Sequence, residues 1–119
     1  MKAKPENQSV IALVAFLEQQ SRKNKAPIWK DVSELVSKAG RKKAGVNLYK
    51  LDKYSKEGDT LVVPTKVLGI GSLSHKITLA ALSISKPARS AVEKSGSKVL
   101  SIRAFATANP KGSKARIII

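Results

Sequence analysis

The amino-acid sequence predicts an α/β domain in which two helices precede a series of strands and short helices. Near the start of the chain, apolar residues recur at three- and four-residue steps, a spacing typical of one face of a helix. From residue 46 onward the chain is rich in β-branched residues that partly alternate with polar ones, which is typical of strands. Because further helical patterns lie among these strands, the sequence favours an α/β order.

Two helices are expected in the first 45 residues. The apolar residues between 10 and 17 share one face of a first helix over about residues 8–22. Pro27 suits the first turn of a second helix, and Gly40 is a plausible C-terminal cap for it. Trp29, beside Pro27, is expected to pack inward where that helix begins. The segment GRKKAG at 40–45 is then expected to form a basic loop between two glycines.

Strands are expected in the rest of the chain. Pro64 lies inside the second of them and argues for an edge strand, a strand end or a bulge. A turn is expected at 56–59. Between the third and fourth strands, Ser85 is expected to cap a short helix that Gly96 ends. Another short helical turn, ended by Pro110, should follow the fourth strand. The segments with a strand pattern are 46–51, 60–71, 77–84, 98–105 and 115–119.

Composition limits the organisation of the chain. A length of 119 residues suits one domain, which we expect to consist of a basic helical region at 1–45 and an α/β core at 46–119. The apolar run at 10–17 is far shorter than the ~20 residues of a membrane span, and no signal-peptide pattern follows it, so a cytoplasmic protein is expected. With no cysteine, disulfides and cysteine-ligated zinc are excluded. No metal or cofactor is expected.

Positive charge is the strongest compositional signal. The chain has 23 Lys and Arg against 8 Asp and Glu, a formal net charge of +15, and no acid follows Glu93. Such an excess repels itself in the free protein and is balanced when a polyanion binds, so a nucleic acid is the expected partner. With one Trp, two Tyr and two Phe, a surface that stacks unpaired bases is poorly supplied. Recognition of the backbone and shape of the nucleic acid fits this composition better than stacking of its bases.

Several basic segments are candidates for phosphate contacts. The cluster at 40–45 is the strongest, because it contains three consecutive cations. Lys86 and Arg89 stand at the start of a predicted helix, where free amides also attract phosphate. The side chains that we expect to contact RNA are Arg22, Lys23, Lys25, Lys30, Arg41, Lys42, Lys43, Lys66, Lys76, Lys86, Arg89, Lys111, Lys114 and Arg116.

The segment LGIGSLSHKIT at 68–78 raises the question of nucleotide binding. A phosphate-binding loop needs a glycine directly before its lysine, and here His75 precedes Lys76, so the motif fails. His75 is the only histidine and lies far in sequence from any acid, so no catalytic triad is predicted. Lys66, Lys76 and the amides of Gly69 and Gly71 can still meet an RNA phosphate, because glycine allows close backbone approach.

The segment NPKGSKARIII at 109–119 combines cations with three isoleucines. We expect 109–112 to form a turn in which Gly112 allows close approach to RNA. The chain then re-enters the body as a strand. Ile117 and at least one further isoleucine are expected to be buried against the strands near 61–67 or 77–84.

Three stretches together resemble one protein family. They are PIWKDVSELV at 27–36, the run from Gly45 to Val99, and NPKGSKARII at 109–118. The chain is similar to the archaeal form of large-subunit ribosomal protein eighteen, a family shared with eukaryotes and related to bacterial large-subunit protein fifteen. This resemblance spans about residues 8–118. The long glycine-rich basic arm of the bacterial relative is not expected here.

The resemblance implies a fold and a function. The fold would be an irregular, superhelical winding of β-β-α units with an added N-terminal helical region. The protein would be a structural constituent of the large ribosomal subunit that binds ribosomal RNA, adjoins other ribosomal proteins and catalyses nothing.

Two alternatives remain open from the sequence. A DNA-compacting chromatin protein would explain the charge. A nucleotide-dependent RNA-modifying enzyme would need an acid or base near Lys76, and residues 60–92 contain no Asp or Glu.

Overall fold

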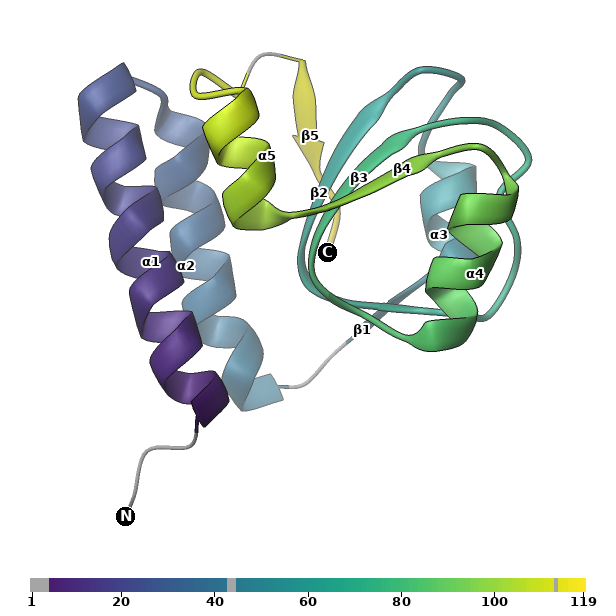
Figure 1. Ribbon diagram of the computed structural model, residues 1–119, viewed down its shortest axis with the longest axis horizontal. Coiled ribbons are helices and arrows are strands. Elements are labelled where there is room, and N and C mark those ends of the chain that lie inside the picture. Colours follow the sequence, from purple (N-terminus) through teal and green to yellow (C-terminus); the bar gives the residue numbers. More distant parts are fainter. Residues whose placement is uncertain (1–4, 43–44, 113) are drawn as a thin grey trace.

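The computed structural model of the chain describes residues 5–42, 45–112 and 114–119, and the side chains of 11–37, 45–112 and 114–119. Helices and strands alternate after two opening helices, as the α/β prediction requires (Figure 1). In chain order the elements are α1 (Pro5–Asn24), α2 (Pro27–Lys42), β1 (Gly45–Asn47), α3 (Leu48–Lys53), β2 (Thr60–Leu68), β3 (Thr78–Ile84), α4 (Lys86–Lys94), β4 (Lys98–Ser101), α5 (Ile102–Ala108) and β5 (Ala115–Ile117).

All strand pairs in the sheet are parallel. β3 lies between β2 and β4, and it pairs with β2 along almost its whole length. The opposite edge of β2 is shared by two short strands. Its first residues, Thr60–Val62, pair with β5, and its last residues, Lys66–Leu68, pair with β1. The register between β2 and β3 shifts between Val63 and Lys66. Of the three alternatives that Pro64 left open, a bulge in a central strand is therefore correct.

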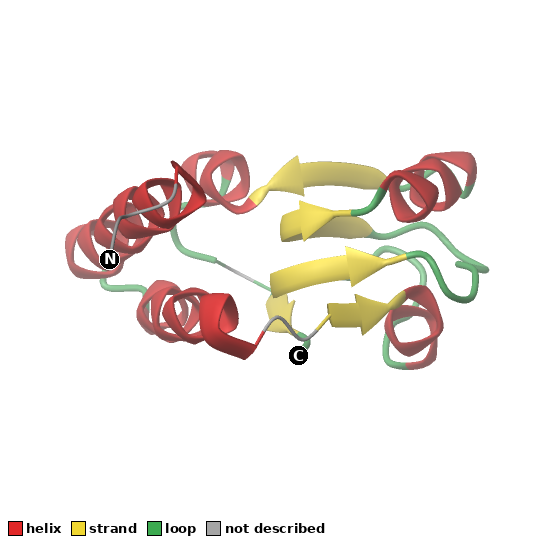
Figure 2. Ribbon diagram, turned by 90° about the horizontal axis from the view of Figure 1, so that it is seen from below, coloured by secondary structure: helices red, strands yellow, loops and turns green. Residues whose placement is uncertain are grey.

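The sheet separates two layers of helices. Helices α1, α2 and α5 cover one face, and the short helices α3 and α4 cover the other (Figures 1 and 2). Alternation along the strands divides the apolar side chains between the faces. In β2, for example, Leu61 and Val63 point toward α3 and α4, whereas Val62 points toward α1 and α2.

The two hydrophobic clusters differ in composition. The cluster under α1, α2 and α5 contains Trp29 and Phe105, whose rings meet edge to face at a centroid distance of 5.7 Å, and we call it the aromatic cluster. The cluster under α3 and α4 consists of Leu, Val, Ile and Ala, and we call it the aliphatic cluster. Its members include Leu48, Leu51 and Val92.

Three of the sequence predictions for local structure are wrong. The strand expected at 98–105 ends at Ser101, and Ile102–Ala108 form α5. The second helix does not end at Gly40 but continues to Lys42, because an interior glycine costs only about 1 kcal/mol and does not by itself end a helix. Consequently Arg41 and Lys42 belong to α2 and not to a loop. The strand expected at 46–51 stops at Asn47, where α3 begins. Leu48 and Leu51 are both fully buried, and their three-residue spacing is helical.

Other local predictions are confirmed. Ser85 caps α4 by accepting a hydrogen bond from the amide of Ala88, and Gly96, with a φ of 84°, follows the end of that helix. Trp29 is fully buried where α2 begins. In the described residues, no helix combines the length and hydropathy of a membrane span.

The C-terminal segment re-enters the body as a strand, as predicted, but Ile117 is only partly buried instead of buried. β5 lies against Thr60–Val62, within the region that the sequence indicated. Ile118 is buried in the aliphatic cluster, and Ile117 packs half-buried against the aromatic cluster. The terminal strand therefore contributes to both faces of the sheet.

Candidate nucleic-acid interface

Every expected RNA-contacting cation whose side chain the structure describes is exposed to solvent. Arg41 and Lys42 lie in the last turn of α2, and their side chains are outside the described ones. Lys43 lies outside the described residues. The exposed cations are Arg22, Lys23, Lys25, Lys30, Lys66, Lys76, Lys86, Arg89, Lys111, Lys114 and Arg116.

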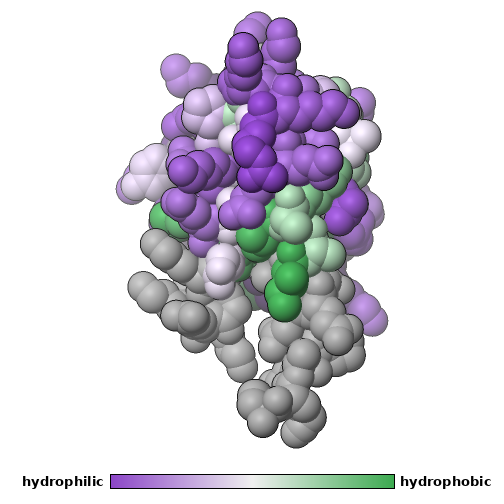
Figure 3. All heavy atoms as spheres, turned by 90° about the vertical axis from the view of Figure 1, so that its left-hand side faces the viewer, coloured by the Kyte–Doolittle hydropathy of each residue, from purple (hydrophilic) through white to green (hydrophobic). Residues whose placement is uncertain are grey.

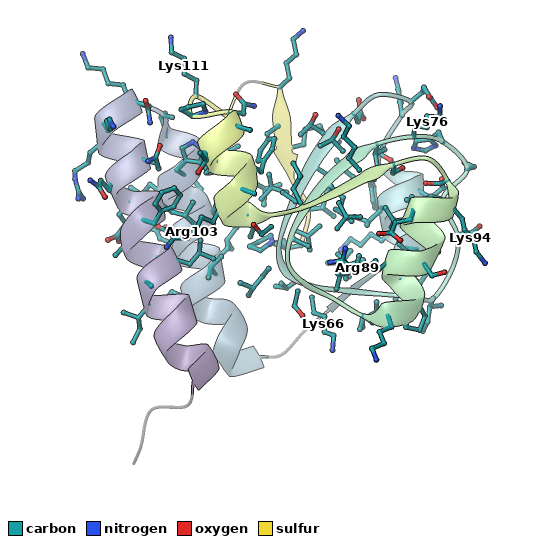
Figure 4. All side chains as sticks on the ribbon, in the orientation of Figure 1. Lys66, Lys76, Arg89, Lys94, Arg103 and Lys111 are labelled. Atoms are coloured by element: carbon teal, nitrogen blue, oxygen red, sulfur yellow. The ribbon has the colours of Figure 1, made fainter. Side chains whose placement is uncertain are left out.

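The fold brings together two basic segments that lie some eighty residues apart in sequence. The indole Nε1 of Trp29 donates a hydrogen bond of 2.6 Å to the carbonyl oxygen of Pro110. This bond fixes the turn at 109–112 beside the junction of α1 and α2 (Figure 1). Segments 22–30 and 109–112, the latter followed by Lys114, thus form one surface, which we call the upper basic surface. Lys111 projects from it (Figure 4), and hydrophilic side chains dominate this end of the α1–α2 layer (Figure 3).

The turn at 109–112 confirms the predicted geometry but corrects the expected role of its glycine. The amide of Gly112 donates to the carbonyl of Asn109 at 2.9 Å, and Gly112 has a φ of 63°. A Cβ at this position would collide with the side chain of Ile28. Gly112 is buried, so the close approach that it allows is to α2 and not to RNA.

A second group of expected cations lies at the carboxyl ends of the strands. Lys66 in β2 pairs in register with Ser83 in β3. Ser83 also lines a shallow groove of about 320 Å³, together with Arg89 of α4 and Ser101 of β4. Figure 4 shows Lys66 and Arg89 on this side of the molecule. In open parallel sheets, ligands commonly bind at this end of the strands.

Other expected cations have protein neighbours or lie apart from these groups. Arg116 approaches Asp59 with 3.4 Å between Nη1 and Oδ2. Arg89 lies 3.7 Å from Glu93 on the surface of α4, a contact of small energetic value because both side chains are more than half exposed. Lys76 lies at the other end of the strands, where a Cβ on Gly96 would be 2.9 Å from its Cε.

Sequence reasoning missed several exposed cations. Arg103 of α5 covers the ring of Phe16 in α1, with 4.4 Å between its Cζ and the ring centroid. Lys94 and Lys98 are exposed as well. All three lie in the acid-free stretch after Glu93, and this stretch was the signal that could have found them.

His75 lies in a polar network that its sequence neighbourhood did not reveal. Its Nε2 is 2.7 Å from Oγ of Ser55, and its Nδ1 is 3.4 Å from Oδ1 of Asp52. Although His75 lies far from any acid in sequence, α3 packs against the loop that carries it and brings Asp52 close. Asp52 also accepts hydrogen bonds of 2.9 and 2.8 Å from the amide and hydroxyl of Ser74.

These hydrogen bonds distinguish the network from a catalytic triad. The Ser55 hydroxyl donates its proton to the carbonyl of Leu51 at 2.6 Å, so Nε2 of His75 must be the donor toward Ser55. A nitrogen that carries a proton cannot act as a general base for that serine. Ser55 is also buried, with 8% of its surface exposed. The arrangement ties α3 to the β2–β3 loop.

The same hydrogen bonds perturb the acid of the network. The amide of Ser74, followed by its hydroxyl, lowers the pKa of Asp52 below its ordinary value of 3.8, because both donors stabilise the carboxylate. Partial burial acts in the opposite direction, and the charge of His75 lowers this pKa further.

The sequence is similar to that of large-subunit ribosomal proteins. A family model that describes ribosomal proteins 50S-L15 and 50S-L18e and their 60S relative matches residues 24–100. The large ribosomal subunit protein eL18 of Methanococcus maripaludis is 49% identical over 106 residues, which cover 89% of this chain and 88% of that protein. The eL18 proteins of Thermoplasma volcanium and Archaeoglobus fulgidus are 39% and 40% identical, each over 113 residues and more than nine-tenths of both chains.

Proposed function

The chain belongs to the family of large-subunit ribosomal proteins that includes archaeal eL18, and we propose that it binds and stabilises folded ribosomal RNA through Lys and Arg contacts to phosphates. Its family places it in the large subunit of the cytoplasmic ribosome. We propose that it acts there as a structural constituent, without catalysis or cofactor, beside neighbouring ribosomal proteins.

One observation carries the proposal of phosphate contacts. The Trp29–Pro110 hydrogen bond joins two segments that are basic in their own right into the upper basic surface. Six exposed cations contribute to it, and each can release a condensed counterion when it neutralises a phosphate. They are Arg22, Lys23, Lys25, Lys30, Lys111 and Lys114.

The arrangement of these cations favours a folded RNA over an extended polyanion. The surface is carried by two helices and a turn that is anchored to a buried indole, so the backbone positions from which its cations extend are fixed relative to one another. A duplex or a folded junction presents phosphates at fixed positions as well. Fixed backbone positions on both partners reduce the entropy that binding must remove.

The dependence of binding on salt tests the proposal. We expect the affinity of the full chain for large-subunit ribosomal RNA to fall steeply with salt in filter-binding titrations. In a variant with Lys111→Ala and Lys114→Ala, the plot of log affinity against log salt should become less steep. The magnitude of its negative slope should fall by about 0.9 for each phosphate that is no longer neutralised. Thermal melting of this variant should match that of the parent, because both side chains are exposed.

A matched control separates local contact from net charge. The pair Lys56→Ala and Lys94→Ala removes the same charge from exposed positions outside the upper basic surface. An equal change of slope in both pairs would show that only net charge matters, and the assignment of this surface would then be wrong. The salt dependence of RNA binding can be measured in the same way for a triple variant in the basic segment at 41–43, with Arg41→Ala, Lys42→Ala and Lys43→Ala. A slope equal to that of the parent would remove this segment from the proposed interface.

A second experiment tests the identity of the nucleic acid. We expect the protein to sediment with the large ribosomal subunit after a high-salt wash, and sequencing of the copurified nucleic acid to return ribosomal RNA. Recovery of genomic DNA instead would favour the chromatin alternative.

A further inference from the structure

Both tyrosines of the chain are exposed on the surface of α3. Tyr49 is 57% exposed and Tyr54, directly after the helix, is 47% exposed. The other aromatic side chains belong to the α1–α2–α5 layer, where Trp29 and Phe105 are buried. The molecule thus keeps its tyrosines outside the core, and exposed aromatic rings of this kind are enriched at contact surfaces.

The position of Tyr49 is fixed by its backbone. Its amide donates a hydrogen bond of 3.1 Å to the carbonyl of Ile70. A Cβ on Gly71 would lie 2.6 Å from the Tyr49 nitrogen, so the loop packs directly on the start of α3. This packing leaves Ile70, which is 64% exposed, next to Tyr49. On the inner side, Leu48 and Leu51 are fully buried and hold the helix in the core.

Two cations, Lys50 and Lys53, lie on the same short helix as the exposed rings. The Lys53 ammonium lies 5.5 Å from the centroid of the Tyr54 ring, and Lys50 donates a hydrogen bond to the carbonyl of Ile119. Among the described residues, Lys53 pairs with no carboxylate, whereas Lys50 contacts the main-chain oxygen of Ile119, the last residue of the sequence. Asp52, the acid of this helix, is bound by Ser74. The face therefore combines a ring without a stacked neighbour in the described structure, Tyr49, with two cations.

This combination suits one kind of ligand. A nucleobase stacks on an aromatic ring, and the phosphates on either side of that base are within the reach of flexible lysines. An apolar protein surface would cover Tyr49 and Ile70 equally well, but it would leave Lys53 without counter-charge at its margin. The charge of the face therefore favours RNA over protein.

We propose that the α3 face, formed by Tyr49, Lys50, Lys53, Tyr54 and Ile70, holds an unpaired RNA nucleotide whose base stacks on Tyr49 while the lysines contact the flanking phosphates. This inference rests on the proposed binding of ribosomal RNA and adds a mode of recognition to it. The sequence favoured backbone and shape recognition because aromatic residues are few. The structure shows that two of these few, Tyr49 and Tyr54, are exposed.

Two RNA probes separate stacking from phosphate contact. One is a single-stranded oligoadenylate of about ten nucleotides, and the other is an RNA duplex of about 16 base pairs, whose bases are already stacked. At one salt concentration, Tyr49→Ala in the full chain should weaken binding of the single strand on the order of tenfold and leave duplex binding unchanged. Tyr49→Phe should keep parental affinity for both, because stacking needs the ring and not the hydroxyl.

The outcomes are distinguishable. Parental affinity of Tyr49→Ala for the single strand would overturn the inference, as would a loss in Tyr49→Phe equal to that in Tyr49→Ala. Duplex binding by the parent without single-strand binding would overturn this inference alone. If the parent bound neither RNA, the proposed function would fail as well. Thermal melts of both variants should match the parent, because the tyrosine side chain is largely exposed.

Discussion

The two faces of the sheet are stabilised in different ways. The aromatic cluster joins segments from both ends of the chain, and one hydrogen bond from Trp29 to Pro110 spans 81 positions in sequence. The aliphatic cluster is formed by residues between 46 and 92 together with Ile118, and it is bordered by the polar network of Asp52, Ser55, Ser74 and His75. The comparison teaches that one face adds two aromatic rings and a long-range hydrogen bond to its aliphatic packing, whereas the other is wholly aliphatic and borders a network with titratable groups.

The largest expected effect is in the aromatic cluster. Trp29→Ala removes a fully buried indole, its packing against Phe105 and the only described donor to the Pro110 carbonyl, so we expect a loss of about 3–5 kcal/mol in unfolding free energy. Leu51→Ala, at a fully buried position of the aliphatic cluster, should cost less, at the lower end of the range of about 2–5 kcal/mol. Urea unfolding followed by circular dichroism measures both. A greater loss in Leu51→Ala would invert the comparison.

The next effect concerns the segment that touches both faces. Deletion of residues 117–119 removes the buried Ile118 and the half-buried Ile117, and should cost about 3 kcal/mol. Deletion of Ile119 alone is the control, because this side chain is 58% exposed, and it should change the melting temperature little. A melt unaffected by the longer deletion would show that β5 does not contribute to the core.

A pair of glycines tests how the 109–112 turn is held. Gly58 has a φ of 85° and open space where a Cβ would stand, so Gly58→Ala should cost only the backbone strain of about 1 kcal/mol. Gly112→Ala has the same kind of strain and also a collision with Ile28, so we expect about 1 kcal/mol more. Equal losses in the two variants would indicate that α2 yields easily, and the turn would then be held by Trp29 alone.

The smallest expected effect is specific to the network face and depends on pH. The folded protein lowers the pKa of Asp52 below 3.8, so the stabilisation from this carboxylate is present above that pH and is lost as the pH falls through the lower, folded pKa. Ser74→Ala removes the hydroxyl donor to this carboxylate but keeps the amide donor, so it should remove part of this contribution. The loss of stability between pH 6 and strongly acidic solution should therefore be smaller in Ser74→Ala than in the parent.

A control for this comparison lies on the other side of the molecule. Glu18→Gln removes an exposed carboxylate of α1, outside the network. Its denaturation midpoints should follow those of the parent across the same pH range. An acid dependence that Ser74→Ala leaves unchanged would show that the Ser74 hydroxyl does not stabilise the Asp52 carboxylate.

Local signals in the sequence predicted much of the fold. Ser85 and Gly96 marked the ends of α4 because capping depends on neighbouring residues alone. The strand prediction for 46–51 failed because periodicity over six residues does not distinguish a strand that ends at Asn47 from a helix that buries Leu48 and Leu51. Gly40 misled in a similar way, because helix termination needs more than one permissive residue.

The candidate site was less predictable than the fold. The exposure of the cations was predictable, because Lys and Arg side chains are rarely buried. The contact between segments 22–30 and 109–112 was not, because it depends on a tertiary hydrogen bond that no local sequence pattern encodes. Likewise, His75 is far from Asp52 in sequence and within 3.4 Å of it in the fold. The exposure of Tyr49 depends on which side of α3 is buried, and the sequence pattern predicts a strand for these residues.

The short strands at the margins of the sheet have a consequence for the protein before it meets RNA. β2, the longest strand with nine residues, is paired on both sides, whereas the outer strands β1 and β5 have three residues each and β4 has four. Lys98, at the start of β4, is exposed. Short, charged margins are poor templates for the addition of another chain. Newly made copies that await assembly are therefore protected from self-association through their strands, although each carries a complete parallel sheet.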